Sequence, residues 1–517
     1  MSSEESRREA KAETGVWGAA SLEGAISAAE YVRGFDGGFG ADAPFFAEFN
    51  ASASGSAALL GFRRLNDGNG GSEANKEDAA DFADVAARTT MEARTRGVGI
   101  AGAGLMGVSI AAAFLGAGFP VLAFDSFASA LETAPKRIEA ELAEQRRRRG
   151  VAESDSATEK RLVAEIVANG LTTSDSFAEL AARPVVVETI PEKIKIKSKF
   201  YKTLAKTATA PILLTSNTSS ICVSDLAAAL PTASENPNVN RERFCGFHFF
   251  HPVCRRSLVE VMRGVFTAPG TVAEAAALGA AIFKTPIIVG DGPGFLVNRM
   301  LQPYLNEGLA LLDEGVPAAR VEAICRRFGF EAGPLRIMDE IGLDVSLHAG
   351  WTFLKAFPER TTSSPILPEL TRRERLGRKT RRGFYRFESG TSWADDATLD
   401  FDAETLAELR AGETFASGAE SVDVGAQDAS DEELALRVAT AILFESARLV
   451  EAGVVETFRE ADAGLVLALG FPPEKGGIFY WAAAFGLRRI LAAAERWAGA
   501  GVRFVAPESL RRLAVEG

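Results

Sequence analysis

The sequence is poor in the residues that disulfides and many metal sites need. Among its 517 residues there are 3 histidines and 4 cysteines. The cysteines, Cys222, Cys245, Cys254 and Cys325, are scattered and form no CxxC pair. This spacing excludes a disulfide framework and favours a reducing compartment.

The sequence also lacks an apolar run of the roughly 18 to 20 residues that a membrane-spanning helix needs. Its first residues, MSSEESRREAKAE, are polar and contain no apolar signal-peptide core. The formal net charge of −12 argues against broad binding to nucleic acids or anionic membranes. Composition, with 47% hydrophobic and 24% charged residues, is that of a soluble globular protein. We therefore expect a cytoplasmic protein of three or four domains.

Two of the three histidines, His248 and His251, lie in one stretch, CGFHFFHPVCRRSLVE (residues 245–260). Its apolar residues predict a buried strand that ends at Pro252, because proline lacks the N–H that a strand pair needs. A histidine fixed there is suited to accept a proton near neutral pH, and Glu260 in the next apolar run is suited to orient it. The alternative is that both histidines are hydrogen-bonded core residues.

The same stretch has the spacing of a zinc site, with Cys245, His248, His251 and Cys254 each three residues apart. Residues three apart on a strand point to opposite faces, so the four side chains would converge only if Pro252 broke the strand. We therefore expect no metal.

A glycine motif stands further toward the N-terminus, in RGVGIAGAGLMGVSIAAAFLGAGFPVLAFD, which begins at Arg96. The pattern predicts a strand, a turn, a helix and a second strand. Gly102, Gly104 and Gly107 form GxGxxG: the first serves the tight turn, the second the approach of a pyrophosphate, and the third helix packing. The start of the helix offers N–H groups to phosphates.

Asp125 ends the second strand, 21 residues after Gly104. An acidic residue at this distance accepts hydrogen bonds from both ribose hydroxyls and repels a 2′-phosphate. Since no arginine follows closely, the sequence favours NAD over NADP. A glycine-rich turn alone is weak evidence, but strand, turn, helix, strand and aspartate occur here in register.

Further strands alternate with helices, which predicts a doubly wound parallel sheet. PVVVETI and PILLTSNTSS are predicted strands, and PEKIKIKSKFYKTLAK between them is a predicted helix. Ligands bind at the carboxyl ends of such strands, where Glu188, Glu192, Asn217 and Ser219 are expected. Alternatively, SNTSS caps a helix. The arginine run 146–149 is expected to be a solvated helix face, with a phosphate-bearing substrate as a second possible use.

The flanking regions are predicted from composition. Residues 1–95 contain glycine-rich stretches between short helical patterns, and Asn66 to Asp81 have the composition of a linker. Gly290 to Gly294 separate a strand from a long helix that Asn298 is expected to open; its carboxamide either reaches a bound oxygen or caps the helix.

An internal repeat follows. NRMLQPYLNEGLALLDEGV, from Asn298, and LRVATAILFESARLVEAGV, from Leu436, share the spacing of an arginine, a glutamate and a glycine. Two copies of one helical domain are predicted to pack on each other. The acidic stretch between them reads as a linker.

Six motifs, GAGLMG, VVVETIPEKIKIK, SNTSS, HFFHPV, LVEVMRG and GFLVNR, occur in the order in which they occur in L-3-hydroxyacyl-CoA dehydrogenases. Over about residues 96–486 the chain resembles the dehydrogenase half of the multifunctional fatty-acid oxidation enzymes, without their enoyl-CoA hydratase half. Residues 45–64 are similar to the linker helix that precedes the dehydrogenase there.

The resemblance implies a fold and a division into domains. The fold is α/β, a Rossmann-type doubly wound parallel sheet followed by two tandem all-α domains. We expect an N-terminal helical extension and linker (1–95), an NAD-binding domain (96–290), a first helical domain (291–388), a linker (389–430) and a second helical domain (431–517).

The resemblance also implies site residues. His248 corresponds to the catalytic base and Glu260 to its charge partner, while Ser219 and Asn298 correspond to residues that hold the substrate oxygen. Arg148 falls where the family has a CoA-contacting lysine. The family's nearby serine is replaced by Glu141, and His251 replaces the usual asparagine of HFFNP, which affects rate and pH optimum more than the reaction. The cofactor-contacting positions are Gly102, Gly104, Leu105, Met106, Gly107, Asp125, Glu192, Lys197 and Asn217.

The expected reaction is NAD-dependent oxidation of (3S)-hydroxyacyl-CoA to 3-ketoacyl-CoA in fatty-acid β-oxidation. Two alternatives are a dehydrogenase of a 3-hydroxy acid that is not a thioester and a catalytically silent NAD-binding subunit. Single-domain relatives commonly dimerise through the helical domain. The second copy here could occupy that surface, so we expect a monomer or weak oligomer, with a thiolase or hydratase as a possible partner.

Overall fold

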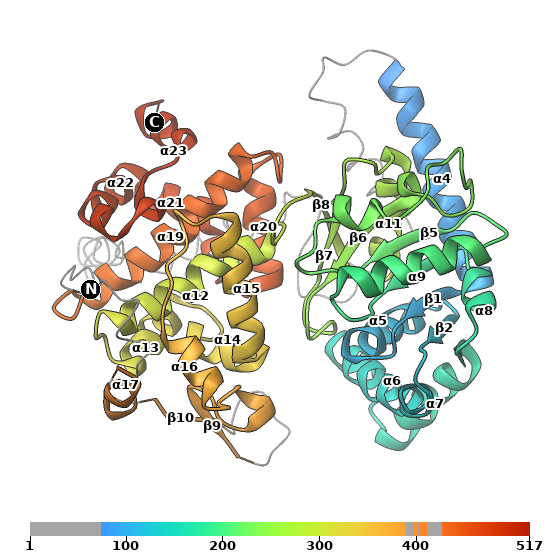
Figure 1. Ribbon diagram of the computed structural model, residues 1–517, viewed down its shortest axis with the longest axis horizontal. Coiled ribbons are helices and arrows are strands. Elements are labelled where there is room, and N and C mark those ends of the chain that lie inside the picture. The colour runs from blue at the N-terminus through green and yellow to red at the C-terminus, as the bar shows by residue number, and fades with distance from the viewer. Residues whose placement is uncertain (1–73, 389–396, 402, 411–425, 517) are drawn as a thin grey trace, which may run out of the picture. The chain divides into compact units, whose positions relative to one another are not determined.

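The computed structural model in Figure 1 describes residues 74–388, 397–401, 403–410 and 426–516. The described residues divide into two compact units, which meet in sequence between Phe295 and Leu296. We call them the sheet unit and the helical unit. The predicted linker helix at residues 45–64 lies outside the described residues. None of the described helices is both long enough and apolar enough to cross a membrane.

The sheet unit is built on an eight-stranded sheet in the order β3-β2-β1-β4-β5-β6-β7-β8. Neighbours from β3 to β6 are parallel, as predicted. The predicted parallel, doubly wound sheet is confirmed except at one pair: β7 is antiparallel to β6, and β8 is parallel to β7. The connection 250–257 is shorter than the dozen or so residues that a parallel crossover needs, which forces a hairpin. The strands are β1 (Val98–Ala101), β2 (Val121–Phe124), β3 (Leu171–Ser174), β4 (Val185–Glu188), β5 (Leu213–Ser216), β6 (Phe244–Phe249), β7 (Leu258–Arg263) and β8 (Thr285–Gly290).

Helices cover both faces of the sheet, and its inner strands are therefore buried. Every residue of β1, β2, β4 and β5 is buried, as expected for apolar strands of a sheet covered on both sides. The helices are α4 (Ala74–Arg96), α5 (Leu105–Gly116), α6 (Ala128–Arg148), α7 (Ser156–Gly170), α8 (Phe177–Ala181), α9 (Ile194–Thr207), α10 (Val223–Ala227) and α11 (Pro269–Ala281), with one 3₁₀ turn at Arg241–Arg243.

The first described helix corrects one prediction. Residues 74–81, which composition assigns to a linker, form the first two turns of α4. Helix α4 packs along α11, where Ala86 and Ala277 form a small buried cluster. Thr89 Oγ1 donates a hydrogen bond of 2.8 Å to Glu274 Oε2. Helix α4 is therefore part of the sheet unit (Figure 1).

The helical unit shows the predicted repeat as two successions of helices. The first is α12 (Val297–Asp313), α13 (Ala318–Phe328), α14 (Pro334–Ile341), α15 (Leu343–Ala356) and α16 (Ile366–Arg372). The second is α19 (Asp431–Glu451), α20 (Phe458–Leu469), α21 (Ile478–Phe485), α22 (Leu487–Arg496) and α23 (Glu508–Glu516), with 3₁₀ turns at Pro473–Lys475, Ala498–Ala500 and Val502–Phe504.

Part of the predicted linker between the two copies is ordered. Strand β9 (Tyr385–Phe387), after a 3₁₀ turn at Arg378–Thr380, pairs with β10 (Ala397–Leu399), and α17 (Ala403–Arg410) follows. Strand β10 and α17 fall within the 389–430 range that we expect to be a linker, so this segment contains secondary structure of its own.

Helices α12 and α19 pack on each other at the centre of the helical unit. Arg299 of α12 pairs with Glu445 of α19 at 2.6 Å, and Arg437 of α19 pairs with Glu307 of α12 at 2.9 Å. Arg299 and Arg437 occupy the same place in the repeat, as do Glu307 and Glu445. The two helices are therefore antiparallel and related by an approximate twofold axis.

Candidate active site

The three motif glycines follow β1 and have three different surroundings. Gly102 has φ +106°, which an L side chain rarely adopts, and a Cβ on Gly107 would lie 1.8 Å from the Gly102 carbonyl oxygen. A Cβ on Gly104 would meet nothing within 4 Å, although Gly104 is the N-cap of α5. There is thus open space beside the backbone where the helix presents its N–H groups, which is the condition for a phosphate to approach.

Asp125, directly after β2, is tied to this turn. Its Oδ2 accepts a hydrogen bond of 2.8 Å from the Ala103 N–H, and its Oδ1 accepts one of 3.0 Å from the Phe127 N–H. Arg137 of α6 also reaches the turn, where its Nη1 donates to the Ala103 carbonyl at 2.9 Å. Sequence reasoning missed Arg137, because a helix brings it back from twelve residues beyond the aspartate.

Two residues of the predicted cofactor set, Leu105 and Met106, form the first turn of α5. The Leu105 side chain is 58% exposed, which is unusual for a leucine in an otherwise buried helix. Both residues lie directly after the open space at Gly104.

Behind the turn, at the end of β4, lies a buried polar network around Glu188. Its Oε1 accepts from Lys197 Nζ at 2.6 Å, and its Oε2 accepts from Tyr201 and Ser216 at 2.7 Å each. Burial, and then the charge of Glu188, raise the pKa of Tyr201 well above its ordinary value, so the phenol stays a hydrogen-bond donor. This network fixes the carboxyl ends of β4 and β5 relative to α9.

Glu192 organises the SNTSS turn after β5. Its Oε1 accepts from Thr218 Oγ1 at 2.6 Å and from the N–H of Ser219 at 3.0 Å, while Lys197 lies 3.2 Å from its Oε2. Burial opposes ionisation of Glu192, but Lys197 and these hydrogen bonds outweigh it and hold its pKa below the usual value. The charged carboxylate is therefore the form that orders the turn.

The alternative that SNTSS caps the following helix is not what the contacts show. Helix α10 has Cys222 at its N-cap without a side-chain cap, and Asp291 accepts from the N–H groups of Val223 and Ser224 at 2.8 and 2.7 Å. Asn217 instead joins two strands, since its N–H donates to the Glu188 carbonyl and its Oδ1 accepts from the Phe249 N–H at 2.8 Å.

His248 and Glu260 face each other across the β6–β7 hairpin. His248 Nδ1 lies 2.6 Å from Glu260 Oε2, and the two residues are 5% and 0% exposed. The edge of Phe250 packs against the imidazole, with ring centroids 4.5 Å apart. An ionised carboxylate can only accept, so this contact favours the tautomer with the proton on Nδ1 and the lone pair on Nε2.

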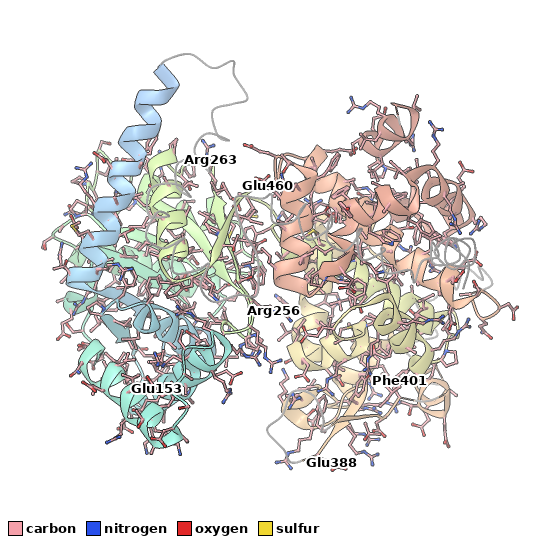
Figure 2. The ribbon with its side chains drawn as sticks, turned by 180° about the vertical axis from the view of Figure 1, so that it is seen from behind. Glu153, Arg256, Arg263, Glu388, Phe401 and Glu460 are labelled. Carbon is pink, nitrogen blue, oxygen red and sulfur yellow. The ribbon has the colours of Figure 1, made fainter. Side chains whose placement is uncertain are left out.

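The loop after His248 is held in place by Lys284, which directly precedes β8. Sequence reasoning missed this lysine. Lys284 Nζ donates to the carbonyls of Val253 at 2.5 Å and Arg256 at 2.7 Å. Figure 2 labels Arg256, which lies in this loop. Burial lowers the pKa of Lys284 to about 8. No sequence motif marks Lys284, because its partners are backbone atoms.

The zinc spacing does not produce a site. Cys245 is buried in the main apolar cluster, whereas His251 is exposed. Within the described parts of the chain, no group of three or more histidine, cysteine, aspartate or glutamate side chains is arranged to hold a metal ion.

The remaining residues of the predicted site lie on helices α6 and α12. Arg148, at the end of α6, is paired with Glu144, its Nε lying 2.5 Å from Oε1. Glu141 on the same helix has a buried Oε2 without a hydrogen-bond partner among the described residues. Asn298 is the second residue of α12 in the helical unit, so the helix begins one residue earlier than predicted.

Two family models match the chain. Residues 97–292 match the NAD binding domain of 3-hydroxyacyl-CoA dehydrogenase, and residues 294–387 match the C-terminal domain of the same family. The chain belongs to the 3-hydroxyacyl-CoA dehydrogenase family. It is accordingly an oxidoreductase with NAD as cofactor, and the open space at Gly104 beside Asp125 fits that cofactor.

Solved structures of 3-hydroxyacyl-CoA dehydrogenases resemble the chain. A 3-hydroxybutyryl-CoA dehydrogenase from Escherichia coli K12 is 26% identical with a TM-score of 0.65, covering 81% of this chain and 98% of its own. An (S)-3-hydroxybutyryl-CoA dehydrogenase from Ralstonia eutropha is 31% identical with a TM-score of 0.50, covering 56% of this chain and 99% of its own. The E. coli similarity extends beyond residues 97–387, which make up a smaller share of this chain.

The dehydrogenase part of a multifunctional enzyme from C. elegans is 23% identical, with a TM-score of 0.53 over 80% of this chain and 88% of its own. At this identity it shows the fold alone. The predicted likeness to dehydrogenase parts of multifunctional enzymes is confirmed at the level of fold.

Proposed function

We propose that this dehydrogenase oxidises (3S)-hydroxyacyl-CoA to 3-ketoacyl-CoA with NAD, in the β-oxidation of fatty acids. The observation that carries the proposal is the buried hydrogen bond between His248 and Glu260, 2.6 Å long. His248 lies on β6, and a hydrogen bond with Asn217 joins this strand to the NAD-binding part of the sheet.

In this proposal His248 is the general base. Its Nε2 takes the proton of the substrate's C3 hydroxyl, and Glu260 stabilises the imidazolium that forms. Bound NAD supplies the acceptor for the hydride that leaves C3. The near-complete burial of the pair strengthens the electrostatic interaction, since the local dielectric is lower than in water.

Ser219 and Asn298 are proposed to hold the substrate oxygen as it becomes a carbonyl. The backbone of Ser219 is fixed by its bond to Glu192, so the hydroxyl starts from a defined position. This gives Glu192 and Lys197 positioning roles. Lys197 is 1% exposed and paired with Glu188 and Glu192, so it acts on the cofactor site through these carboxylates.

The proposed cofactor contacts follow from the turn. Gly102, Gly104 and Gly107, with Leu105 and Met106, offer backbone to the pyrophosphate, and Asp125 accepts from the ribose hydroxyls. For the CoA moiety we propose Arg148. The unpartnered carboxylate oxygen of Glu141 on the same helix would oppose a phosphate close to it.

The test is oxidation of NADH by acetoacetyl-CoA, with longer 3-ketoacyl-CoA substrates in parallel. NADPH is the cofactor control and free 3-keto acids are the thioester control. We expect NADH consumption with CoA thioesters only, and the ranking of substrates gives the chain length. Turnover of free acids would instead support a non-thioester substrate. Absence of any turnover in protein that binds NADH would support a silent subunit.

A further inference from the structure

A cavity in the helical unit lies at the contact between the two helical copies. Its empty space is about 390 Å³ when its opening to solvent is included. Its lining is unusually basic. It includes Arg299, Asn306, Arg360, Glu445, Arg448 and Arg503.

The internal repeat supplies a comparison for this cavity, because the same cluster occurs twice. At one end of the α12–α19 contact, Arg437 pairs with Glu307 at 2.9 Å and with both oxygens of Glu314 at 2.6 Å. Arg503, which also reaches the lining of the cavity, pairs with Glu307. Two arginines therefore meet two carboxylates, and the charges balance.

At the other end, where Arg299, Arg360, Glu445 and Arg448 line the cavity, the charges of the described residues do not balance. Arg299, Arg360 and Arg448 all pair with the same carboxylate, that of Glu445, at 2.6, 3.1 and 3.6 Å. Glu359, 52% exposed, pairs with Arg360 from the surface. Arg299 donates from Nε and Nη2 to one oxygen, Glu445 Oε1, whereas Arg437 at the equivalent place has two glutamates.

Two positions of the repeat account for the difference. The place of Glu314 is taken in the second copy by Ala452, which removes one carboxylate. The place of Arg448 is taken in the first copy by Ala310, so the cavity end has one more arginine. The cavity thus lies where the repeat loses an anionic group and gains a cationic one.

This excess positive charge is poorly solvated. The side chains of Arg299, Arg360 and Arg448 are 7%, 17% and 14% exposed. Burial lowers the pKa of both Arg299 and Arg448; the charge of Glu445 opposes this for both residues, Arg360 reinforces it, and Glu451 also opposes it for Arg448. A buried charge is costly unless it is paired and hydrogen-bonded.

We propose that this cavity binds an oxyanion, a phosphate or carboxylate group, which supplies the negative charge that Glu314 supplies at the other end. Arginine forks are suited to this role because their N–H groups match the geometry of phosphate and carboxylate oxygens. Asn306 adds a polar side chain to the lining. The residues of the site all belong to the helical unit, and the proposal does not depend on the proposed substrate.

The test uses the full chain and measures the thermal unfolding midpoint against inorganic phosphate, with chloride at equal ionic strength as baseline. Citrate is the arm for carboxylates, and isothermal titration calorimetry measures phosphate binding directly. A ligand that binds only the folded state raises the midpoint in a saturable way. We expect such a rise, and the stronger of the two anions identifies the source.

Two variants copy the other end of the contact. Arg448→Ala restores the residue found at position 310, and Ala452→Glu restores the carboxylate found at position 314. We expect each to weaken phosphate binding at least about 10-fold, or 1.4 kcal/mol. Ala452→Glu should also raise the midpoint in chloride alone. Arg161→Ala, an exposed arginine of the sheet unit, is the control.

The proposal is overturned if the unliganded protein shows no saturable phosphate effect. It is also overturned if Ala452→Glu responds to phosphate as strongly as Arg161→Ala does, because the effect would then be general salt stabilisation. Should Arg448→Ala fail to fold, Ala452→Glu decides the question alone, since it adds charge balance without removing a contact.

Discussion

At the scale of single residues, the chemistry of the candidate site depends on which side-chain atoms already form hydrogen bonds within the protein. Glu260 engages Nδ1 of His248, and Glu192 engages the backbone of Ser219. In the proposed mechanism, each carboxylate acts through the neighbouring residue that it orients. Removing a carboxylate and removing its neighbour should therefore have different effects on rate and on cofactor binding.

For His248→Ala we expect a fall in kcat of about 10²- to 10⁴-fold, the range that general-base catalysis contributes. Binding of NADH, measured by fluorescence titration, should stay close to wild type, because the turn that holds the cofactor does not involve His248. His348→Ala is the matched control: this exposed histidine of α15 should lose little activity. An equal loss in both variants would contradict the assignment of the base.

Glu260→Gln should lower kcat as well, since a glutamine amide turned toward Nδ1 leaves the proton on Nε2. The loss of an equivalent carboxylate in another histidine dyad reaches about 10⁴-fold. The readout is the pH profile of kcat, in which the variant loses the wild-type dependence on a basic imidazole. An unchanged profile would reduce Glu260 to a packing role.

Asp339 gives a prediction about stability and pH in the helical unit. It is fully buried and accepts from the N–H groups of Phe384 and Tyr385, and burial, against these bonds, raises its pKa to about 7. The folded state therefore binds a proton that the unfolded state has lost, so stability falls as pH rises from about 4 to 7. Over three pKa units this amounts to about 4 kcal/mol. Urea unfolding should show this slope in wild type and not in Asp339→Asn.

At the scale of elements, substitutions in the glycine turn should distinguish cofactor binding from folding. Gly104→Ala should fold normally, because its methyl group meets nothing within 4 Å, yet weaken NADH binding by about 10-fold or more by filling the space a pyrophosphate needs. Gly107→Ala places a methyl group 1.8 Å from the Gly102 carbonyl oxygen and should lower the unfolding midpoint. Normal NADH affinity in Gly104→Ala would contradict a cofactor at this turn.

Elements with large apolar residues or fixed turn chemistry were predictable from sequence. The strand–turn–helix–strand unit at Gly102 is confirmed, because a short motif determines it. Helix α4 was missed because its buried face consists of Ala86, Thr90 and Ala93. Small residues bury well against another helix but give no hydrophobic periodicity.

Pairings between distant elements were less predictable. The short connection between β6 and β7 predicts a hairpin, but the register that places Glu260 opposite His248 is not determined by a local pattern. The repeat was visible as shared spacing of Arg299 with Glu307 and of Arg437 with Glu445. The spacing did not show that each arginine meets the glutamate of the other copy.

At the scale of the whole molecule, the crossed pairing makes the helical unit an internal dimer. Such a contact is self-complementary: the same positions occur on both sides of the approximate twofold axis. In a chain that contains both copies, α19 covers this surface of α12. We therefore propose that the full chain is a monomer or weak oligomer.

A chain cut after Glu388 should dimerise, because it exposes the face of α12 that α19 covers. In a true twofold dimer, Arg299 of one copy meets Glu307 of the other, as Arg299 meets Glu445 within the full chain. Light scattering after size exclusion should give twice the chain mass for the truncated protein. Adding Glu307→Arg to the truncated chain should abolish the dimer, since arginines would then face arginines across the axis. If the truncated chain without this substitution is a folded monomer, α12 alone does not carry the contact.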